Sequence, residues 1–266
     1  MSRLVSHLGR LVLLLVLLCW LASLGIDHDL VADVDPGRAG LWPDPAHPLG
    51  TDHMGRSVAW RLLTASEAFV GPGLLAIAVA LGLGRPSGAV AGYLGGPVAA
   101  AVRYLYAVLA ALPRFVLVLL ACAIYGNEAT VLAAAAGLSY APGLGAAVQH
   151  RIEELRGRDF VLATRAHGVG PGRTLAWHLV WVNCRVLVAR ELLALLSFVL
   201  VLETTLSYIG GFGIEEPMPS WGNMLAFEFG VHDGNPLAWA APALAIWITA
   251  AATQAVASGL QEPGRA

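Results

Sequence analysis

The chain has 266 residues, a mean hydropathy of +0.68 and 13% charged residues, well below the roughly 25% that is usual for soluble domains. Its net charge is −2, so nothing in its bulk charge points to a nucleic-acid partner, and all 16 basic residues are arginine. A P-loop needs a lysine on the phosphates, so a standard ATP site of that kind is excluded from this chain.

Six apolar segments are long enough to be membrane spans, which need about 20 apolar residues. They cover residues 8–26, 68–92, 104–125, 129–148, 186–209 and 236–260. The first lacks a clean small-residue cleavage site, so we expect an uncleaved signal-anchor helix. The predicted fold class is an all-α polytopic membrane protein with six transmembrane helices. Three cysteines without close spacing predict neither a disulfide framework nor a zinc site.

The loops between the spans differ in charge. Six aspartates lie within residues 27–52, and the loop before the last span is also acidic, whereas six arginines lie between the fourth and fifth spans. With the N-terminus inside, ten arginines fall on the inner side and three on the outer side. Because cytoplasmic loops carry the excess of basic residues, both termini are predicted to be cytoplasmic, at the inner cell membrane.

Some residues inside the spans permit two interpretations. Prolines and glycines within them indicate either bends that line a cavity or close packing between helices. These residues are Gly82, Gly84, Pro86, Pro113, Pro142 and Gly143.

Ionisable residues inside spans are costly, so Arg85 and Glu203 are candidates for a substrate pathway, or else for mutual pairing. Arg114 and Arg190 are better explained by pairing or by reaching an interface. His47, Asp52 and His53 could suggest a metal site, but Pro48 and a nearby glycine favour a turn, and we predict no metal.

One segment interrupts the apolar pattern, at residues 158–178. Apolar residues and arginines alternate there at helical spacing, then three glycines and a proline end the helix. The segment TLAWHLVWVN predicts a second helix leading into the fifth span. A helix followed by a rigid turn favours a groove on a partner protein over simple contact with lipid.

Five motifs in order resemble the membrane-spanning subunits of ABC importers, in particular the C-type permease subunits of dipeptide and oligopeptide systems. The motifs are HPLGTDHMGRSV, AGYLGG, LPRF, RDFVLATRAHGVG and LETTLSYIGGFGIEEPMPSWGNML, which run from about residue 47 to 225. The resemblance implies a type I ABC importer permease fold. It divides the chain into an N-terminal anchor and extracytoplasmic segment (1–60), a permease domain (61–260) and a cytoplasmic tail (261–266).

The resemblance also implies that residues 158–183 are the EAA loop, whose short helix sits in a cleft of an ATPase subunit. The residues expected to make that contact are Ala163, Thr164, Arg165, Ala166, His167, Gly168 and Val169. Three positions differ from the family's loop pattern. Leu162 replaces a glutamate, Thr164 replaces the second alanine, and Trp181 replaces a proline.

The implied assembly is a heterodimer with a homologous B-type permease in the lipid bilayer, with two ATP-binding subunits and an extracytoplasmic solute-binding protein. ATP and Mg would bind the partner ATPases, and this chain would be a transport subunit without a cofactor or catalytic residues. The expected cargo is short peptides. Alternatives are nickel or haem in a related permease, or an ATP-independent secondary transporter, which would show inverted repeats and midplane charges.

Overall fold

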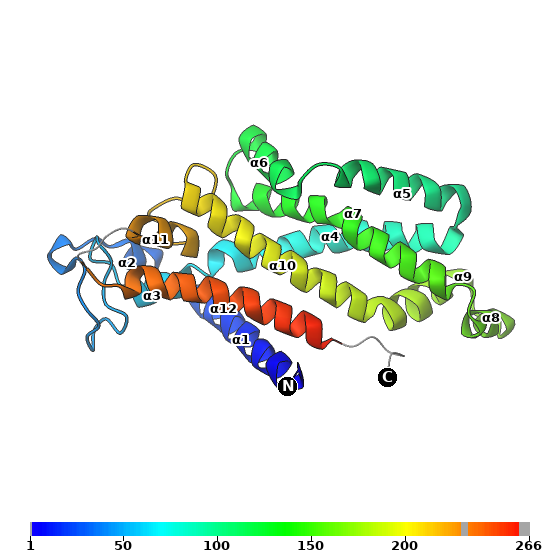
Figure 1. Ribbon diagram of the computed structural model, residues 1–266, viewed down its shortest axis with the longest axis horizontal. Coiled ribbons are helices and arrows are strands. Elements are labelled where there is room, and N and C mark those ends of the chain that lie inside the picture. The colour runs from blue at the N-terminus through cyan, green and yellow to red at the C-terminus, as the bar shows by residue number, and fades with distance from the viewer. Residues whose placement is uncertain (1, 230–233, 261–266) are drawn as a thin grey trace.

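A computed structural model describes residues 2–229 and 234–260, and within them the chain is helical almost throughout (Figure 1). The predicted tail, 261–266, lies outside the described residues. The elements in chain order are α1 (Ser2–Ser23), α2 (His28–Ala32), η1 (Pro36–Arg38), α3 (Val58–Thr64), α4 (Glu67–Leu94), α5 (Gly96–Ala110), α6 (Arg114–Tyr125), α7 (Ala129–Leu155), α8 (Asp159–Ala166), α9 (Pro171–Arg173), η2 (Thr174–Asn183), α10 (Cys184–Ile209), α11 (Trp221–Glu228) and α12 (Leu237–Gly259).

Four helical segments of the described chain are long and apolar enough to cross a membrane: Leu4–Ser23, Val58–Leu94, Ala129–Leu155 and Leu237–Gly259. They match the first, second, fourth and sixth predicted spans, so the prediction of a polytopic helical membrane protein is confirmed. α10 covers the predicted fifth span and has 26 residues, but it is not among these four. The exact count of six spans therefore stays a prediction.

The third predicted span, 104–125, is not one continuous helix, and the bend that Pro113 allowed is present. α5 and α6 occupy this region and meet at 73°, so together they form at most one broken span or a re-entrant pair. Pro113 lies at the N-cap of α6. Proline lacks an N–H for the helix ladder and disfavours helical backbone in the residue before it, which explains the break.

α4 and α7 pack backbone against backbone. Gly84, Gly88 and Gly92 stand at every fourth position of α4, and a Cβ at any of them would lie 2.1–2.6 Å from a carbonyl oxygen of α7. Small residues at such spacing let two membrane helices approach closely. Of the two interpretations left open above, close packing is therefore confirmed for Gly84, whereas Gly82 faces open space.

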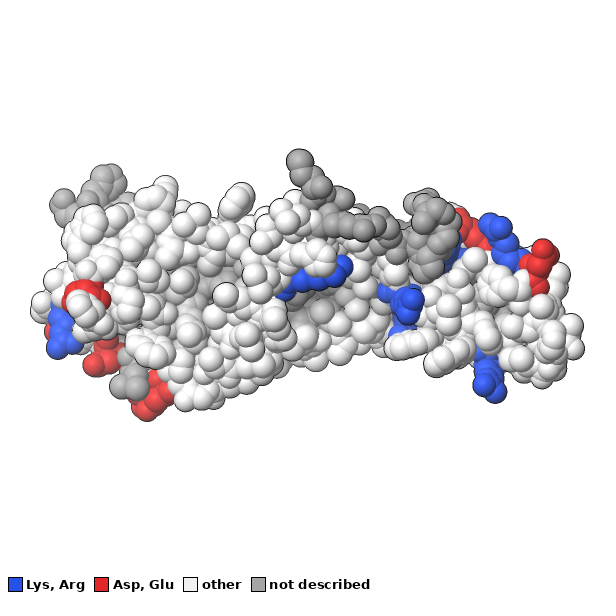
Figure 2. Space-filling model, turned by 90° about the horizontal axis from the view of Figure 1, so that it is seen from below, with Lys and Arg blue, Asp and Glu red and all other residues white. Residues whose placement is uncertain are grey.

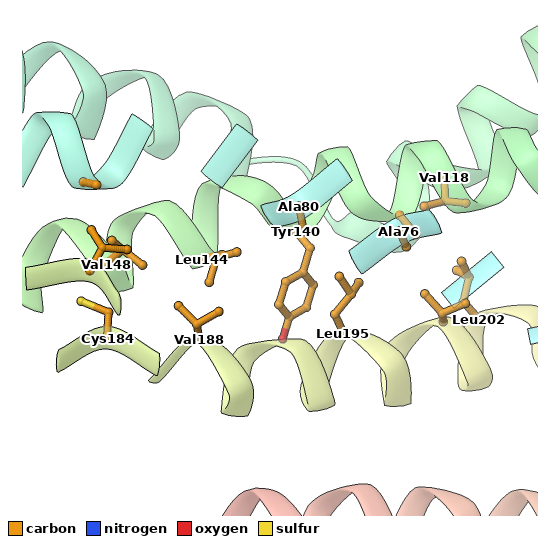
Figure 3. Close-up of a cluster of buried hydrophobic side chains, with 14 of the residues drawn as sticks. Ala76, Ala80, Val118, Tyr140, Leu144, Val148, Cys184, Val188, Leu195 and Leu202 are labelled. Atoms are coloured by element: carbon orange, nitrogen blue, oxygen red, sulfur yellow. The ribbon is translucent and has the colours of Figure 1, made fainter. Parts of the chain in front are cut away.

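α10 packs against the α4–α7 pair and completes the main hydrophobic core. In Figure 3, Cys184, Val188, Leu195 and Leu202 of α10 point toward α7 and α4, and Tyr140 projects between the helices. A smaller cluster around Phe69 and Trp221 joins α4, α11 and α12.

The elongated bundle has two different ends (Figure 1). The acidic segment around α2 lies with α11 at one end, and α8 projects from the other. The start of α1 and the end of α12 both point toward the α8 end. The loop charges predict this separation of the acidic segments from the arginine-rich segment. Which end faces the cytosol stays a prediction.

The α4–α7 contact can be tested with a single methyl group. We expect Gly88→Ala to destabilise the protein by about 1–3 kcal/mol, because the new Cβ overlaps Gly145. Gly82→Ala is the matched control, since it adds the same methyl group into open space and gains helix propensity. Thermal unfolding in detergent should show a lower midpoint only for Gly88→Ala. Equal midpoints for the two variants would contradict the contact.

Candidate functional site: a projecting helix and a charged cap

α8 is a short helix with a defined start and stop. Asp159 lies in its first turn, where a carboxylate favours the positive end of the helix dipole. At its end, the backbone N–H of Val169 donates to the carbonyl of Thr164 at 3.0 Å, and Gly168 between them has φ +75°. This is a glycine-terminated C-cap, and it fixes the sharp turn after α8.

One residue anchors α8 to the bundle. Val161 is fully buried in the main core, together with Leu155 of α7 and Leu179 of η2. The neighbouring Leu162 is 54% exposed. α8 is thus held by one face, and the described part of the chain leaves its opposite face uncovered.

The seven residues predicted to contact an ATPase run along α8 and into the following turn. Ala163, Ala166, His167 and Gly168 are exposed, whereas Thr164 and Val169 are half-buried. The side chain of Arg165 lies outside the described residues. A Cβ at Gly168 would meet nothing within 4 Å, so the turn leaves room for another backbone. The role of these residues in ATPase contact stays a prediction.

The predicted second helix, TLAWHLVWVN, is present as η2, and the short α9 directly precedes it. η2 is a π-helix of ten residues, and it continues directly into α10. Asn183 donates from its side-chain amide to the carbonyl of His178 at 2.6 Å. π-helical segments are mostly single turns and are frequent at functional sites, so one of this length at the base of α8 marks the segment as unusual.

The structure does not bring the two candidate pathway residues together. Glu203 is 2% exposed and accepts a hydrogen bond from Ser207 at 2.6 Å, on the part of α10 that lies beside α11. Its second oxygen has no partner among the described residues. Arg85 lies half-exposed on α4 and forms no ion pair within the described residues. A pathway role for either residue stays a prediction.

Sequence reasoning missed a cluster of four charges at the opposite end of the molecule, three of them buried and the fourth, Glu216, half-buried. Arg56 binds Asp52 at 2.7 Å and Glu216 at 2.5 Å, and Arg61 binds Glu216 at 2.7 Å. The two arginine side chains are 3% and 1% exposed. The signal was an arginine within the first turns of an apolar helix, which requires a counter-charge. The cluster ties the acidic segment to the loop before α11.

The loop before α11 is held by polar contacts from its own motif. Ser220 and Asn223 form a reciprocal capping box at the start of α11. The Asn223 side chain also donates to the carbonyls of Ile214 and Met218, and the Trp221 indole donates to the carbonyl of Leu62 at 3.0 Å. The PSWGN stretch therefore shapes the loop that carries Glu216.

Two of the three residues considered above as a metal site, Asp52 and His53, lie at the charged cluster. Asp52, His53 and Glu228 offer ligand atoms within 4.8 Å of one another, but His47 is not in this group. The His53 ring contacts Glu228, and its backbone N–H donates to the same carboxylate at 3.1 Å. Asp52 is already paired with two guanidinium groups. Their positive charge disfavours a cation, so the geometry supports a structural turn.

Removal of Glu216 tests the charged cluster. We expect Glu216→Ala to cost about 3–5 kcal/mol, because two buried guanidinium groups lose a counter-charge. The exposed Glu215 makes no ion pair within the described residues, so Glu215→Ala should stay within about 0.5 kcal/mol of the parent. Thermal unfolding and protease cleavage of the outer loops measure the difference. A Glu216→Ala variant as stable as Glu215→Ala would contradict the cluster's role.

Comparisons with known proteins find membrane transport subunits. The chain is 29% identical over 237 residues to the nickel transport system permease protein of Escherichia coli, covering 89% of this chain and 82% of the relative. It is 23% identical to a dipeptide transport system permease protein of Alkalihalophilus pseudofirmus (87% and 75% covered). It is 25% identical to a glutathione transport system permease protein of Pectobacterium atrosepticum (96% and 84% covered).

A family model extends these pairwise matches. It matches residues 84–262, two thirds of the chain, and its description is "Binding-protein-dependent transport system inner membrane component". The matched region begins within α4 and includes α8, η2 and α11. The chain therefore belongs to the family of inner membrane components of binding-protein-dependent transport systems, as the resemblance in its motifs indicates.

Proposed function

We propose that this chain is one permease subunit of an ATP-driven importer for dipeptides or oligopeptides. It would form half of the translocation pathway, with a homologous permease forming the other half. Two relatives named above transport a dipeptide and glutathione, a tripeptide, which supports a peptide cargo. Nickel is the second candidate, because the relative from E. coli is named for nickel.

The observation that carries this proposal is how α8 is attached to the bundle. Its outer face is exposed, and its inner face is attached to the core through Val161. The helix is continuous with α7 on one side through a short turn and with α10 on the other through η2. A force on the exposed face would therefore move both long helices, which is what coupling to an ATPase requires.

On this proposal the chemistry belongs to other subunits. ATP and Mg would bind two partner ATPases, because this chain has no lysine for a P-loop. ATP-driven closure of the ATPases would displace α8 and tilt α7 and α10, which alternates access to the pathway. The acidic end would face outward and dock a solute-binding protein, and both termini would be cytoplasmic, as the arginine distribution favours.

Reconstitution tests the proposal. The chain purified with its permease partner and the ATPases should take up labelled dipeptide only with ATP and the solute-binding protein. Nickel uptake without peptide uptake would show that the cargo is nickel and not a peptide. Peptide uptake by this chain alone, without ATPases, would support an ATP-independent secondary transporter and overturn the proposal.

The turn after α8 offers a sharper test. We expect Gly168→Trp to abolish co-purification of the ATPases and uptake, because the side chain fills the open side of the turn and strains its positive φ. Gly211→Trp is the matched control, since Gly211 has φ +78°, is equally open and lies in the loop after α10. That variant should retain the ATPases. If both variants insert in the membrane and both retain ATPase, α8 is not the contact.

Leu162 allows a gain-of-contact test. A glutamate at this exposed position would offer the ATPase a charge-assisted hydrogen bond that leucine cannot make. We expect Leu162→Glu to change the ATPase activity of the assembled complex by several-fold, in line with about 1 kcal/mol for such a bond. Leu41→Glu is the matched control, since it changes an exposed leucine of the acidic segment outside the spans and should not alter ATPase contact. Unchanged ATPase activity in Leu162→Glu would count against this placement.

A further inference from the structure

Two tryptophans on η2 are not explained by the fold. Trp177 and Trp181 are each 55% exposed, and their rings stack with centroids 6.3 Å apart. The opposite side of the same helix supplies Leu179 and Val180 to the main core. The indoles are therefore directed away from the bundle, and nothing in the described part of this chain covers them.

Cations flank the indole pair at the same four-residue spacing. Arg173 precedes Trp177 by four residues, and Arg185 follows Trp181 by four residues. Both arginines are exposed, and neither forms an ion pair within the described residues. The order along the chain is thus cation, indole, indole, cation.

These four residues lie at a distinct level along the molecule. η2 joins the projecting α8 to α10, so it stands where a polar end meets the apolar body. In the view of Figure 2, most of the surface between the ends is uncharged and the acidic side chains lie only at the two ends. Tryptophan is enriched at the level where a bilayer's hydrocarbon meets its headgroups.

We propose that Arg173, Trp177, Trp181 and Arg185 bind phospholipid headgroups of the membrane leaflet on the α8 side, with a preference for anionic lipid. The indoles would lie at the headgroup level, and the two guanidinium groups would pair with phosphates. This contact would fix the depth of η2, so that a force on α8 tilts α10 and does not push η2 into or out of the bilayer. The lipid contact rests on the assignment of the chain to a membrane transport family, and its effect on α8 rests on the proposed function. Neither depends on which cargo is transported.

Fluorescence quenching tests the depth. The complex of the full chain with its partners is placed in bilayers with lipids brominated near the headgroup end of the acyl chain. The tryptophan emission of the double variant Trp177→Phe/Trp181→Phe is subtracted from that of the parent. The difference is the emission of the two indoles. We expect roughly half or more of this difference emission to be quenched. The difference for Trp42→Phe, a 67% exposed tryptophan in the acidic segment, should be barely quenched.

Two results would overturn the proposal. Difference emission that brominated lipid does not quench would place the indoles against a protein subunit or in water. The lipid preference has its own measurement, the ratio of quenching by brominated phosphatidylglycerol to that by brominated phosphatidylcholine. This ratio should exceed one in the parent and fall to about one in Arg173→Gln/Arg185→Gln, because the paired cations are gone. A ratio of one in the parent would remove the anionic preference.

Discussion

The contact between α4 and α7 places both backbones so close that only glycine fits at positions 84, 88 and 92 of α4. Lipid provides no hydrophobic drive for helix association, so van der Waals contact across such a seam has to hold the helices together. The other elements are arranged on this pair. α10 packs across it through Leu195 and its neighbours, and α5 and α6 lie on its opposite side. On the proposed function, this close packing would let a movement at one end of α7 reach the other end.

The two ends of the molecule differ in how they are held. At the acidic end, buried ion pairs of Arg56 and Arg61 join segments that are about 160 residues apart in sequence. At the other end, α8 is attached mainly through Val161 and leaves its outer face exposed. On the proposed function, the ion-paired end would present a fixed docking surface, and the projecting α8 would receive force at the other end.

The apolar pattern predicted the fold class and most helices, because a membrane span leaves a long and simple signal. It left two interpretations open where the geometry depends on one residue, as at Pro113, where the third predicted span is broken into two helices. The segment 158–183 was predicted as helix, turn and helix, since glycines and proline have local effects. The pairing of Arg61 with Glu216 could not be assigned from sequence, because it joins distant segments. The π-helical form of η2 has no sequence signal that we could have used.

The central claim is that the exposed face of α8 contacts an ATPase, and photo-crosslinking tests it most directly. A photoreactive amino acid is introduced at Ala163, which is exposed on α8, and separately at Gly211 in the opposite loop. Irradiated membranes containing the whole transporter should yield an adduct with the ATPase from position 163 and none from position 211. An adduct from position 211, or no ATPase adduct from position 163 in an assembled and active transporter, would contradict the account.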